Sequence, residues 1–141
     1  MLKKWIYLLV VFFLVFQGHA LADSGTEGVL QKIREDCQTL LIETYKNENS
    51  FVRAAVLRAA GESHDIKLIP LLTKGLEDYY PTARLFALQG LKNISRTAVL
   101  TAARKLTNDT DIWVRSAAVE ILGDEGGPEV AEEIRVYLKS Y

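Results

Sequence analysis

Three arginines and two aspartates recur at a fixed spacing and are the charged residues best placed to bind an anion. Arg53, Arg84 and Arg115 are separated by 31 residues twice, and Asp78 and Asp109 each precede the next arginine by six residues. Three guanidinium groups at one spacing could form an anion-binding stripe. The aspartates, however, offer partners to two of the arginines. The spacing therefore favours ion pairs within the protein over a site for an external anion.

Histidine, the residue type that most often carries acid-base and metal chemistry, is scarce. His64 lies in the loop at 62–65, and His19 falls in the N-terminal segment. A metal site needs several converging ligands, and a serine or cysteine nucleophile would have only His64 as its base. The run Gly126-Gly127-Pro128 lacks the lysine and the preceding strand of a phosphate-binding loop. We therefore expect no catalytic, metal-binding or cofactor-binding residue, and a protein that is not an enzyme.

The N-terminus has the three parts of a secretory signal peptide. Lys3 and Lys4 precede an apolar run at 5–16, and a polar break then leads to Ala20 and Ala22. Small residues at these alternating positions are what signal peptidase requires, so we expect cleavage after Ala22. An uncleaved anchor is the alternative, but a helical run of this length spans about 18 Å of a hydrocarbon core that is roughly 30 Å thick. We expect an exported protein, periplasmic or extracellular, that meets a membrane only transiently through its signal.

The charge and the cysteine content of the mature chain indicate which partners it can bind and how its fold is stabilised. Removal of residues 1–22 leaves 15 basic and 18 acidic residues, and the resulting net charge of −3 argues against nucleic acid as a partner. Cys37 is the single cysteine, so it can form no intramolecular disulfide and the fold must depend on packing. Its apolar neighbours at helical spacing favour a buried side chain over a reactive thiol.

The elements that carry the arginines are predicted to be helices. Segments 51–57, 82–88 and 113–119 align at the 31-residue offset. Apolar residues at helical spacing in 66–76 and 97–106 predict a second helix in each period, so each period is a helical hairpin. Gly61 and Gly123 are expected to be left-handed residues after the helices. The offset relates two sets of positions that predict the buried face of one helix in each repeat: Ala55, Phe86 and Ala117, and Ala60, Leu91 and Leu122.

The predicted organisation is a signal peptide at 1–22, a short linker at 23–26, and one repeat domain at 27–141. Hairpins are expected at about 27–61, 65–93 and 97–123. A terminal helix at 128–140 with a charged outer face is expected to cap the stack. The fold class is all-α, an α–α superhelix in which stacked hairpins bury apolar faces that one hairpin could not bury alone.

This pattern resembles the HEAT-like repeat family, in particular its short bacterial form associated with phycocyanobilin lyase subunits. The family's helix-one proline falls on Pro70, and its turn aspartate falls on Asp78 and Asp109. Its Val-Arg pair falls on residues 52–53, 83–84 and 114–115, whereas the first unit has Asn47 in place of the aspartate and the third lacks the proline. The resemblance covers about 27–140. It implies a structural ladder between neighbouring units, formed by Arg53, Asp78, Arg84, Asp109 and Arg115.

The resemblance also indicates where a partner would bind. In HEAT-like stacks the second helix of each hairpin lines the concave side, and aromatic residues and arginine are favoured at binding hot spots. The candidate partner-binding strip consists of Phe51, Leu57, Arg58, Leu88, Gln89, Trp113 and Glu120. The alternative is that Phe51 and Trp113 pack between neighbouring hairpins, and that the row of Leu57, Leu88 and Val119 packs between helices.

These observations predict an exported, non-catalytic scaffold that binds another protein and is monomeric by itself. Two other functions remain open. The resemblance to lyase subunits implies a lyase-like accessory subunit for a bilin or similar pigment, which visible absorbance of the purified chain would reveal. The third function is an architectural component of an envelope assembly, which abundance and oligomeric state would reveal.

Overall fold

Helices make up the regular structure of residues 24–139, the part of the chain that the computed structural model describes. The expected all-α class is therefore confirmed. Contacts divide the chain into two units, Met1–Leu40 and Leu41–Tyr141, which are described separately below. The signal peptide predicted at 1–22 lies outside the described residues. Within them, no helix is both long enough and apolar enough to cross a membrane.

Helix α2 (Ser24–Thr44) accounts for the described part of the first unit. It begins inside the segment expected to be a linker, and Glu27 in its first turn complements the positive end of the helix dipole. Its apolar side chains Val29 and Leu40 are each 59% exposed. Cys37, which was expected to be buried, is only partly so. Burial still raises the pKa of the Cys37 thiol, and the charge of Asp36 adds to the effect.

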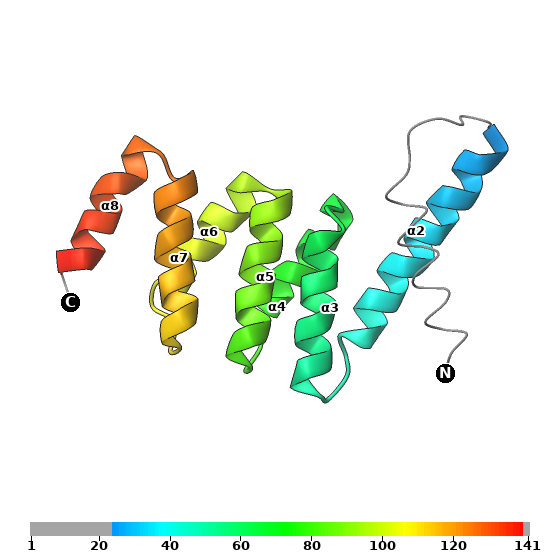
Figure 1. Cartoon of the computed structure of the whole chain (residues 1–141), viewed down its shortest axis with the longest axis horizontal. Helices are drawn as coiled ribbons and strands as arrows, with labels where there is room; N and C mark the ends of the chain where they lie inside the picture. The colour runs from blue at the N-terminus through cyan, green and yellow to red at the C-terminus, as the bar shows by residue number, and fades with distance from the viewer. Residues whose placement is uncertain (1–23, 140–141) are drawn as a thin grey trace. The chain divides into compact units, whose positions relative to one another are not determined.

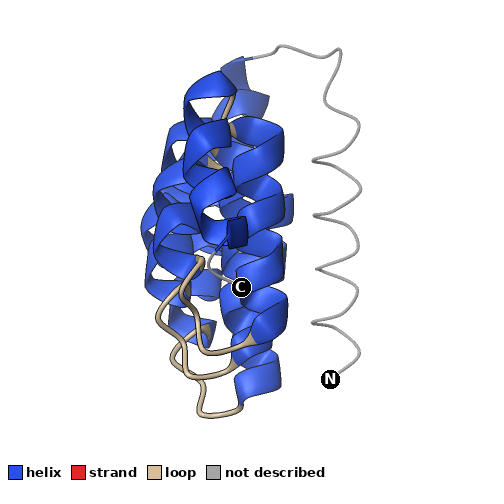
Figure 2. Cartoon of the chain, turned by 90° about the vertical axis from the view of Figure 1, so that its left-hand side faces the viewer, coloured by secondary structure: helices blue, strands red, loops and turns tan. Residues whose placement is uncertain are grey.

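The second unit stacks its helices in two layers (Figure 1). One layer holds α3 (Ser50–Glu62), α5 (Pro81–Ile94) and α7 (Ile112–Glu125), which lie side by side. The other holds η1 (Ile66–Leu68) with α4 (Ile69–Gly75), and then α6 (Arg96–Leu106). Helix α8 (Pro128–Lys139) follows α7 and contacts it. Figure 2 shows the connecting loops gathered mainly at one end of the stack.

The core of the second unit contains side chains from both layers, among them Leu57, Leu88 and Leu72, which have no exposed area. The predicted burial of Ala60, Leu91 and Leu122 is confirmed, since each is at most 1% exposed. The other predicted set is wrong: Ala55 is exposed, and Phe86 and Ala117 are only partly buried. In a helix, residue 55 shares a face with 58 and 62, which point to solvent, whereas 53, 57 and 60 form the inner stripe.

Three turns of the same design precede α3, α5 and α7. The side chains of Asn47, Asp78 and Asp109 each accept a hydrogen bond from the backbone N–H two residues on, at 2.9, 3.0 and 2.8 Å. Asparagine and aspartate favour this turn because their short side chains can reach the nearby amide. Asp111 then caps α7 by accepting from the N–H groups of Trp113 and Val114. The turns fix where each long helix begins.

Glycines permit a close approach between α3 and α5. A Cβ added to Gly61 would lie 2.3 Å from the Cα of Gly90, which no side chain tolerates. Gly61 and Gly123 both lie inside helices, so the prediction that they are left-handed caps is wrong. The described residues with positive φ are His64, at 54°, and Gly127, at 69°. Glycine is needed at position 61 for contact between two helices, and not for a turn.

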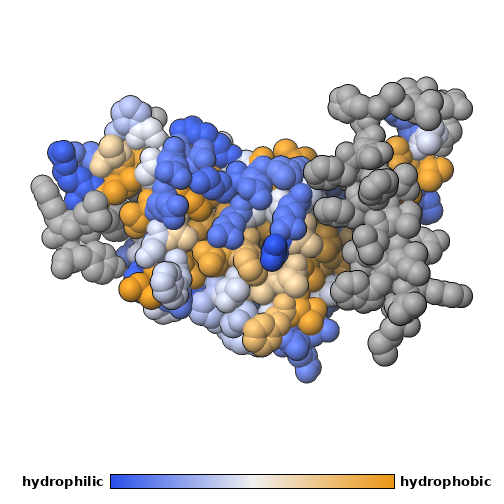
Figure 3. Space-filling view, in the orientation of Figure 1, coloured by the Kyte–Doolittle hydropathy of each residue, from blue (hydrophilic) through white to orange (hydrophobic). Residues whose placement is uncertain are grey.

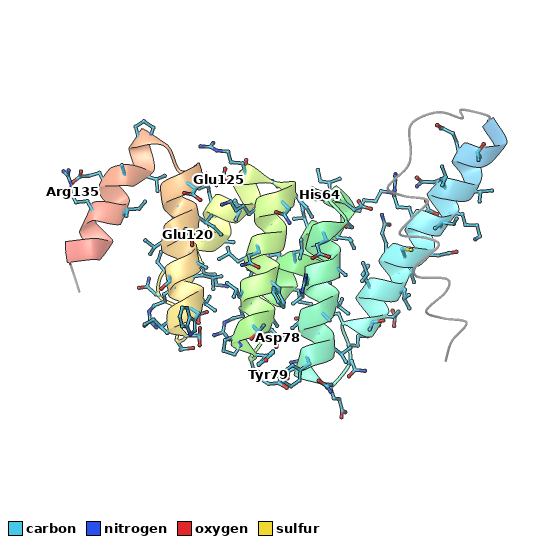
Figure 4. The ribbon with its side chains drawn as sticks, viewed as in Figure 1. His64, Asp78, Tyr79, Glu120, Glu125 and Arg135 are labelled. Carbon is cyan, nitrogen blue, oxygen red and sulfur yellow. The ribbon has the colours of Figure 1, made fainter. Side chains whose placement is uncertain are left out.

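Helix α8 closes the described end of the second unit. Val130 is 2% exposed and Ile134 packs against the core. A Cβ on Gly126 would lie 2.4 Å from the Cβ of Val130, so a glycine is needed where the helix turns back onto α7. Glu132 and Arg135 are exposed on the outer side, where Figure 4 labels Arg135. These positions agree with a terminal helix whose outer face is charged.

Candidate functional site

The arginine ladder (Arg53, Asp78, Arg84, Asp109 and Arg115) lies at the end of the second unit where α3, α5 and α7 begin. Arg53 donates from Nε to Asp78 Oδ2 at 2.7 Å and from Nη2 to Oδ1 at 2.8 Å. Arg84 makes the same two bonds to Asp109, at 2.8 and 2.6 Å. Each pair is therefore bidentate, the strongest arrangement of a guanidinium and a carboxylate. The side chains in both pairs are at most 10% exposed.

The remaining edge of each arginine binds the backbone of its own preceding turn. Nη1 of Arg53 donates to the carbonyls of Asn47 and Glu48. Nη1 of Arg84 donates to Asp78 O at 2.8 Å and to Tyr79 O at 3.2 Å. Arg53 and Arg84 therefore each join the turn before their own helix to the turn before the next one.

Hydrogen bonding, more than charge alone, determines the titration of Asp78. The bond from Arg53 is the main cause that holds the pKa of the carboxyl below its ordinary value, against the effect of burial. Tyr45 also donates its hydroxyl to Asp78, at 3.1 Å. Burial, and then the charge of Asp78, raise the pKa of Tyr45 to about 12. Asp78 is thus a carboxylate surrounded by donors, and Figure 4 shows it at the loop end of α3 and α5.

Asp109 has a similar environment with one donor fewer. Burial would raise the pKa of its carboxyl, but the bond from Arg84 and the backbone N–H of Asp111 lower it overall. No buried polar side-chain atom among the described residues lacks a hydrogen-bond partner. The two ion pairs are therefore complete within the protein, and they have no free group to act on a substrate.

The surface layer of α3, α5 and α7 forms the second feature, which we call the α3–α5–α7 face. A cleft of about 280 Å³ opens on it between α3 and α5, with Gly61 and Gly90 in its lining. Arg58, Phe86 and Gln89 line it as well, together with Glu62 and Asn93. Figure 3 looks onto this face and shows polar residues gathered towards the end where Figure 4 labels His64.

The chemistry of the cleft is mixed. The guanidinium of Arg58 lies 5.9 Å from the centre of the Phe86 ring and donates to Glu62 at 2.9 Å. Both charged side chains are more than half exposed, so this pair contributes little to stability. Gln89 is exposed beside them. An arginine, an aromatic ring and two side-chain amides around a shallow depression suit contact with a protein surface.

The seven residues of the predicted partner-binding strip separate into three groups. Arg58, Gln89 and Glu120 are exposed on the α3–α5–α7 face, the first two beside the cleft. Leu57 and Leu88 have no exposed area, so their assignment to a binding strip is wrong and the alternative of helix packing is correct. Each lies one residue before an exposed position, Arg58 or Gln89, and that single step turns about 100° around the helix axis, from the core side to the surface.

The remaining two strip residues lie at the first turns of their helices. Phe51 is 70% exposed and Trp113 is 75% exposed, so neither is buried in the stack. The Phe51 ring nevertheless contacts the Tyr80 ring of the next unit, which agrees in part with the alternative of packing between neighbouring hairpins. Two further exposed residues at this end, Tyr79 and Ile112, were not identified from the sequence. Tyr79 directly follows the ladder aspartate, a position whose exposure the turn geometry could have indicated. Phe86, which lines the cleft, was missed because it had been assigned to the core, and Asn93 was not predicted as a binding residue.

His64 occupies an exposed loop, as expected, and its Nδ1 lies 2.9 Å from the carbonyl oxygen of Glu62. Across the described residues there is no group of three His, Cys, Asp or Glu side chains able to hold a metal ion.

The chain matches the model of a known repeat family. A family model of HEAT repeats matches residues 69–140, which is just over half of the chain. The match begins at the start of α4 and includes the second and third long helices and α8. It is to HEAT repeats in general and does not single out the phycocyanobilin lyase type. No curated protein matches the chain.

Proposed function

The chain belongs to the HEAT-repeat family, and we propose that it is a scaffold that binds a protein partner through the α3–α5–α7 face. HEAT repeats typically mediate protein interactions, and the family is generally non-catalytic. The observation that carries the proposal is the cleft between α3 and α5, where Arg58, Phe86 and Gln89 surround the approach of Gly61 to Gly90.

The physical basis is the combination of a shallow, open depression with residues that bind well at interfaces. Arg58 can donate up to five N–H groups and can stack on Phe86 while it contacts a partner. Gln89 and Asn93 supply both donors and acceptors. Because Gly61 and Gly90 carry no side chain, α3 and α5 are in backbone contact where the cleft lies. The four paired ladder residues Arg53, Asp78, Arg84 and Asp109 are excluded from this role, since their charged groups are already bound inside the protein.

The test is capture from an extract of the source organism with the tagged chain and matched variants. Arg58→Ala combined with Gln89→Ala removes the polar side chains of the cleft, and Thr101→Ala combined with Lys105→Ala changes exposed positions on α6, in the other layer. A specific partner should be captured by the wild type and by the α6 variant, and lost from the cleft variant. Equal capture by both variants would place the binding site elsewhere, and reproducible turnover of a substrate would contradict the scaffold.

We also propose that the protein is exported through the signal predicted at 1–22. Support comes from the sequence pattern of Lys3, Lys4, the apolar run and Ala20-Leu21-Ala22. The intact mass of the protein isolated from its native cells should correspond to a chain that begins at Asp23. A mass that retains residues 1–22, with the protein found in the cytoplasmic fraction, would contradict export.

A further inference from the structure

Among the side chains that the structure describes, the ladder has no carboxylate partner at its C-terminal end. Arg115 donates Nη1 to Asp109 O at 2.8 Å and to Thr110 O at 3.1 Å, as the two preceding arginines do to their own turns. The edge formed by its Nε and Nη2 meets no carboxylate among the described side chains. In both preceding repeats this same edge binds an aspartate with two hydrogen bonds. The two preceding repeats therefore indicate that the Nε and Nη2 edge of Arg115 fits a carboxylate.

Trp113, an aromatic residue close to Arg115 in the sequence, is exposed to solvent. Trp113 stands where Phe51 stands in the first repeat, and its side chain is 75% exposed. The Phe51 ring meets the Tyr80 ring edge-on, with 5.4 Å between their centres. The Arg53 guanidinium lies 4.7 Å from the centre of the Tyr79 ring. In the first repeat, then, the aromatic residue and the arginine together bind an aspartate that is followed by two tyrosines.

We propose that Trp113 and Arg115 form a docking site for an acidic, aromatic segment of a partner protein. The segment carries a carboxylate, which accepts from Nε and Nη2 of Arg115, and an aromatic ring one or two residues later, which packs on Trp113. Ile112, which is 61% exposed, extends the apolar part of the site. The site lies on the loop end of α7, away from the cleft between α3 and α5, so the proposal goes beyond the function proposed above and does not depend on it.

The occupant is a different protein and not a second copy of this chain. A copy stacked end to end would present the turn before its own α3, where Asn47 stands in place of the ladder aspartate. A carboxamide cannot accept two hydrogen bonds from a guanidinium edge as a carboxylate does. The other ladder aspartates, Asp78 and Asp109, are already bound by Arg53 and Arg84. No described ladder position of a second copy could therefore supply the carboxylate.

Nearby negative charges do not exclude such a ligand. Asp111 is next to the site, but its carboxylate accepts from the N–H groups of Trp113 and Val114 and so caps α7. Asp109 is bound to Arg84. The pair of Arg84 and Asp109 forms in a similar field, because the pKa of Arg84 is raised first by Asp109 and further by the charges of Asp111 and Asp78. Bidentate hydrogen bonding thus prevails over neighbouring carboxylates in this fold.

The test uses a peptide with the sequence of residues 78–82, Asp-Tyr-Tyr-Pro-Thr, labelled with an uncharged fluorescent dye and blocked at both ends, so that its one carboxylate is that of the aspartate. Its binding to the full chain is measured by fluorescence anisotropy up to a protein concentration of about 1 mM. We expect saturable binding that weakens about tenfold when the peptide aspartate is replaced by asparagine, because two charge-assisted hydrogen bonds are lost. The peptide variant leaves the protein unchanged, so folding cannot account for the difference.

Protein variants then locate the site. Arg115→Gln and Trp113→Ala should each weaken binding of the aspartate peptide about tenfold, whereas Arg58→Ala on the α3–α5–α7 face should not change it. Circular dichroism verifies that each variant keeps its helix content. Equal affinity for the aspartate and asparagine peptides, or no binding in this concentration range, would overturn the proposal. Self-association of the chain that Arg115→Gln abolishes would identify a second copy as the occupant and would also overturn it.

Discussion

Two junctions join the long helices, one between α3 and α5 and one between α5 and α7. They have the same contacts at one end and different contacts at the other. At the loop end, both have a buried, bidentate pair of arginine and aspartate. At the opposite end, Gly61 meets Gly90 in the first junction, but the positions 31 residues later are Lys92 and Ile121. Helix α3 therefore contacts α5 more extensively than α5 contacts α7.

This difference separates two tasks that a repeat has to perform. The ladder fixes the order and orientation of neighbouring units, because it requires the same residues at the same spacing. Residue size at the far end sets how closely the long helices approach, because backbone contact is possible only where both residues are glycine. In the second junction Lys92 reaches across instead and donates to Asp124 at 3.1 Å. Units of one design can thus be packed at different distances.

Removal of a ladder carboxylate should produce the largest loss of stability. Asp78→Ala leaves Arg53 charged and buried without its partner and deprives Tyr45 of an acceptor, so the free energy of unfolding should fall by about 3–5 kcal/mol. The matched control is Asn47→Ala, the same turn position without an arginine pair, with an expected loss of about 1 kcal/mol. Urea unfolding followed by circular dichroism measures both. Similar losses would mean that only the turn, and not the ion pair, contributes.

Substitution at the glycine contact should separate the two junctions. Gly61→Ala places a methyl group against the backbone of Gly90 and should destabilise the fold by about 1–3 kcal/mol. Gly123→Ala is the control two repeats later, where an added Cβ would meet nothing nearer than Ile134 at 4.0 Å. This variant should stabilise helix α7 by about 0.5–1 kcal/mol, because alanine favours helix over glycine. A gain in stability for Gly61→Ala would contradict the close approach.

Acid should weaken the arginine–aspartate pairs that both junctions contain. The pKa of Asp78 is lowered chiefly by its hydrogen bond from Arg53, and that of Asp109 is lowered against burial by the bond from Arg84. A carboxyl whose pKa is lower in the folded state adds stability above its unfolded pKa of about 3.9, and this stability is lost as the pH falls through the folded value. The midpoint of urea unfolding should therefore decrease steeply below about pH 4.

The double variant Asp78→Asn with Asp109→Asn provides the control for this acid effect. It should be less stable than the wild type at neutral pH, and its midpoint should depend less on pH in the acid range. An equally steep decrease in the double variant would assign the acid sensitivity to other carboxyl groups.

The smallest effect is expected at the surface pair of the second junction. Lys92 and Asp124 have side chains that are 35% and 56% exposed, so Lys92→Ala should cost less than about 1 kcal/mol. Added salt should reduce even this cost, because ions screen exposed charges. Urea unfolding of the wild type and variant at low and high salt measures it. A loss as large as that of Asp78→Ala would show that the second junction depends on this pair and not on the ladder.

The sequence was sufficient to predict the fold because the repeat is expressed in residues with strict structural needs. The offset of Arg53, Arg84 and Arg115 and the turn aspartates at 78 and 109 specified the hairpins. Apolar spacing then identified the helices to within a few residues. The start of α2 inside the expected linker shows where this reasoning is weakest, since segment 23–26 has polar residues and no apolar period to define a boundary.

The candidate surfaces were harder to predict because exposure changes within a single helical step. Arg58 and Gln89 were assigned to the surface correctly, whereas their neighbours Leu57 and Leu88 were not. Whether Phe51 packs or projects depends on its distance from the turn of the next unit. The local sequence carries no information about that distance. The open edge of Arg115 is recognisable only by comparison with two occupied examples.

The ladder also gives the stack a direction and a unit of growth. The carboxylate that Arg53 and Arg84 each bind belongs to an aspartate 25 residues later, whereas their bonds to the preceding turn go to backbone carbonyls. Suppose that residues 81–111 are duplicated and the copy is inserted after Asp111. The copied Arg84 then lies six residues after the original Asp109, and the copied Asp109 lies 25 residues after the copied Arg84, so both spacings of the ladder are kept. An insertion one residue longer or shorter would change the spacing between an arginine and its aspartate, and within a helix it would turn the residues that follow by about 100° around the axis. Lengthening of such a protein in evolution or in design should therefore proceed by whole 31-residue units, added in register.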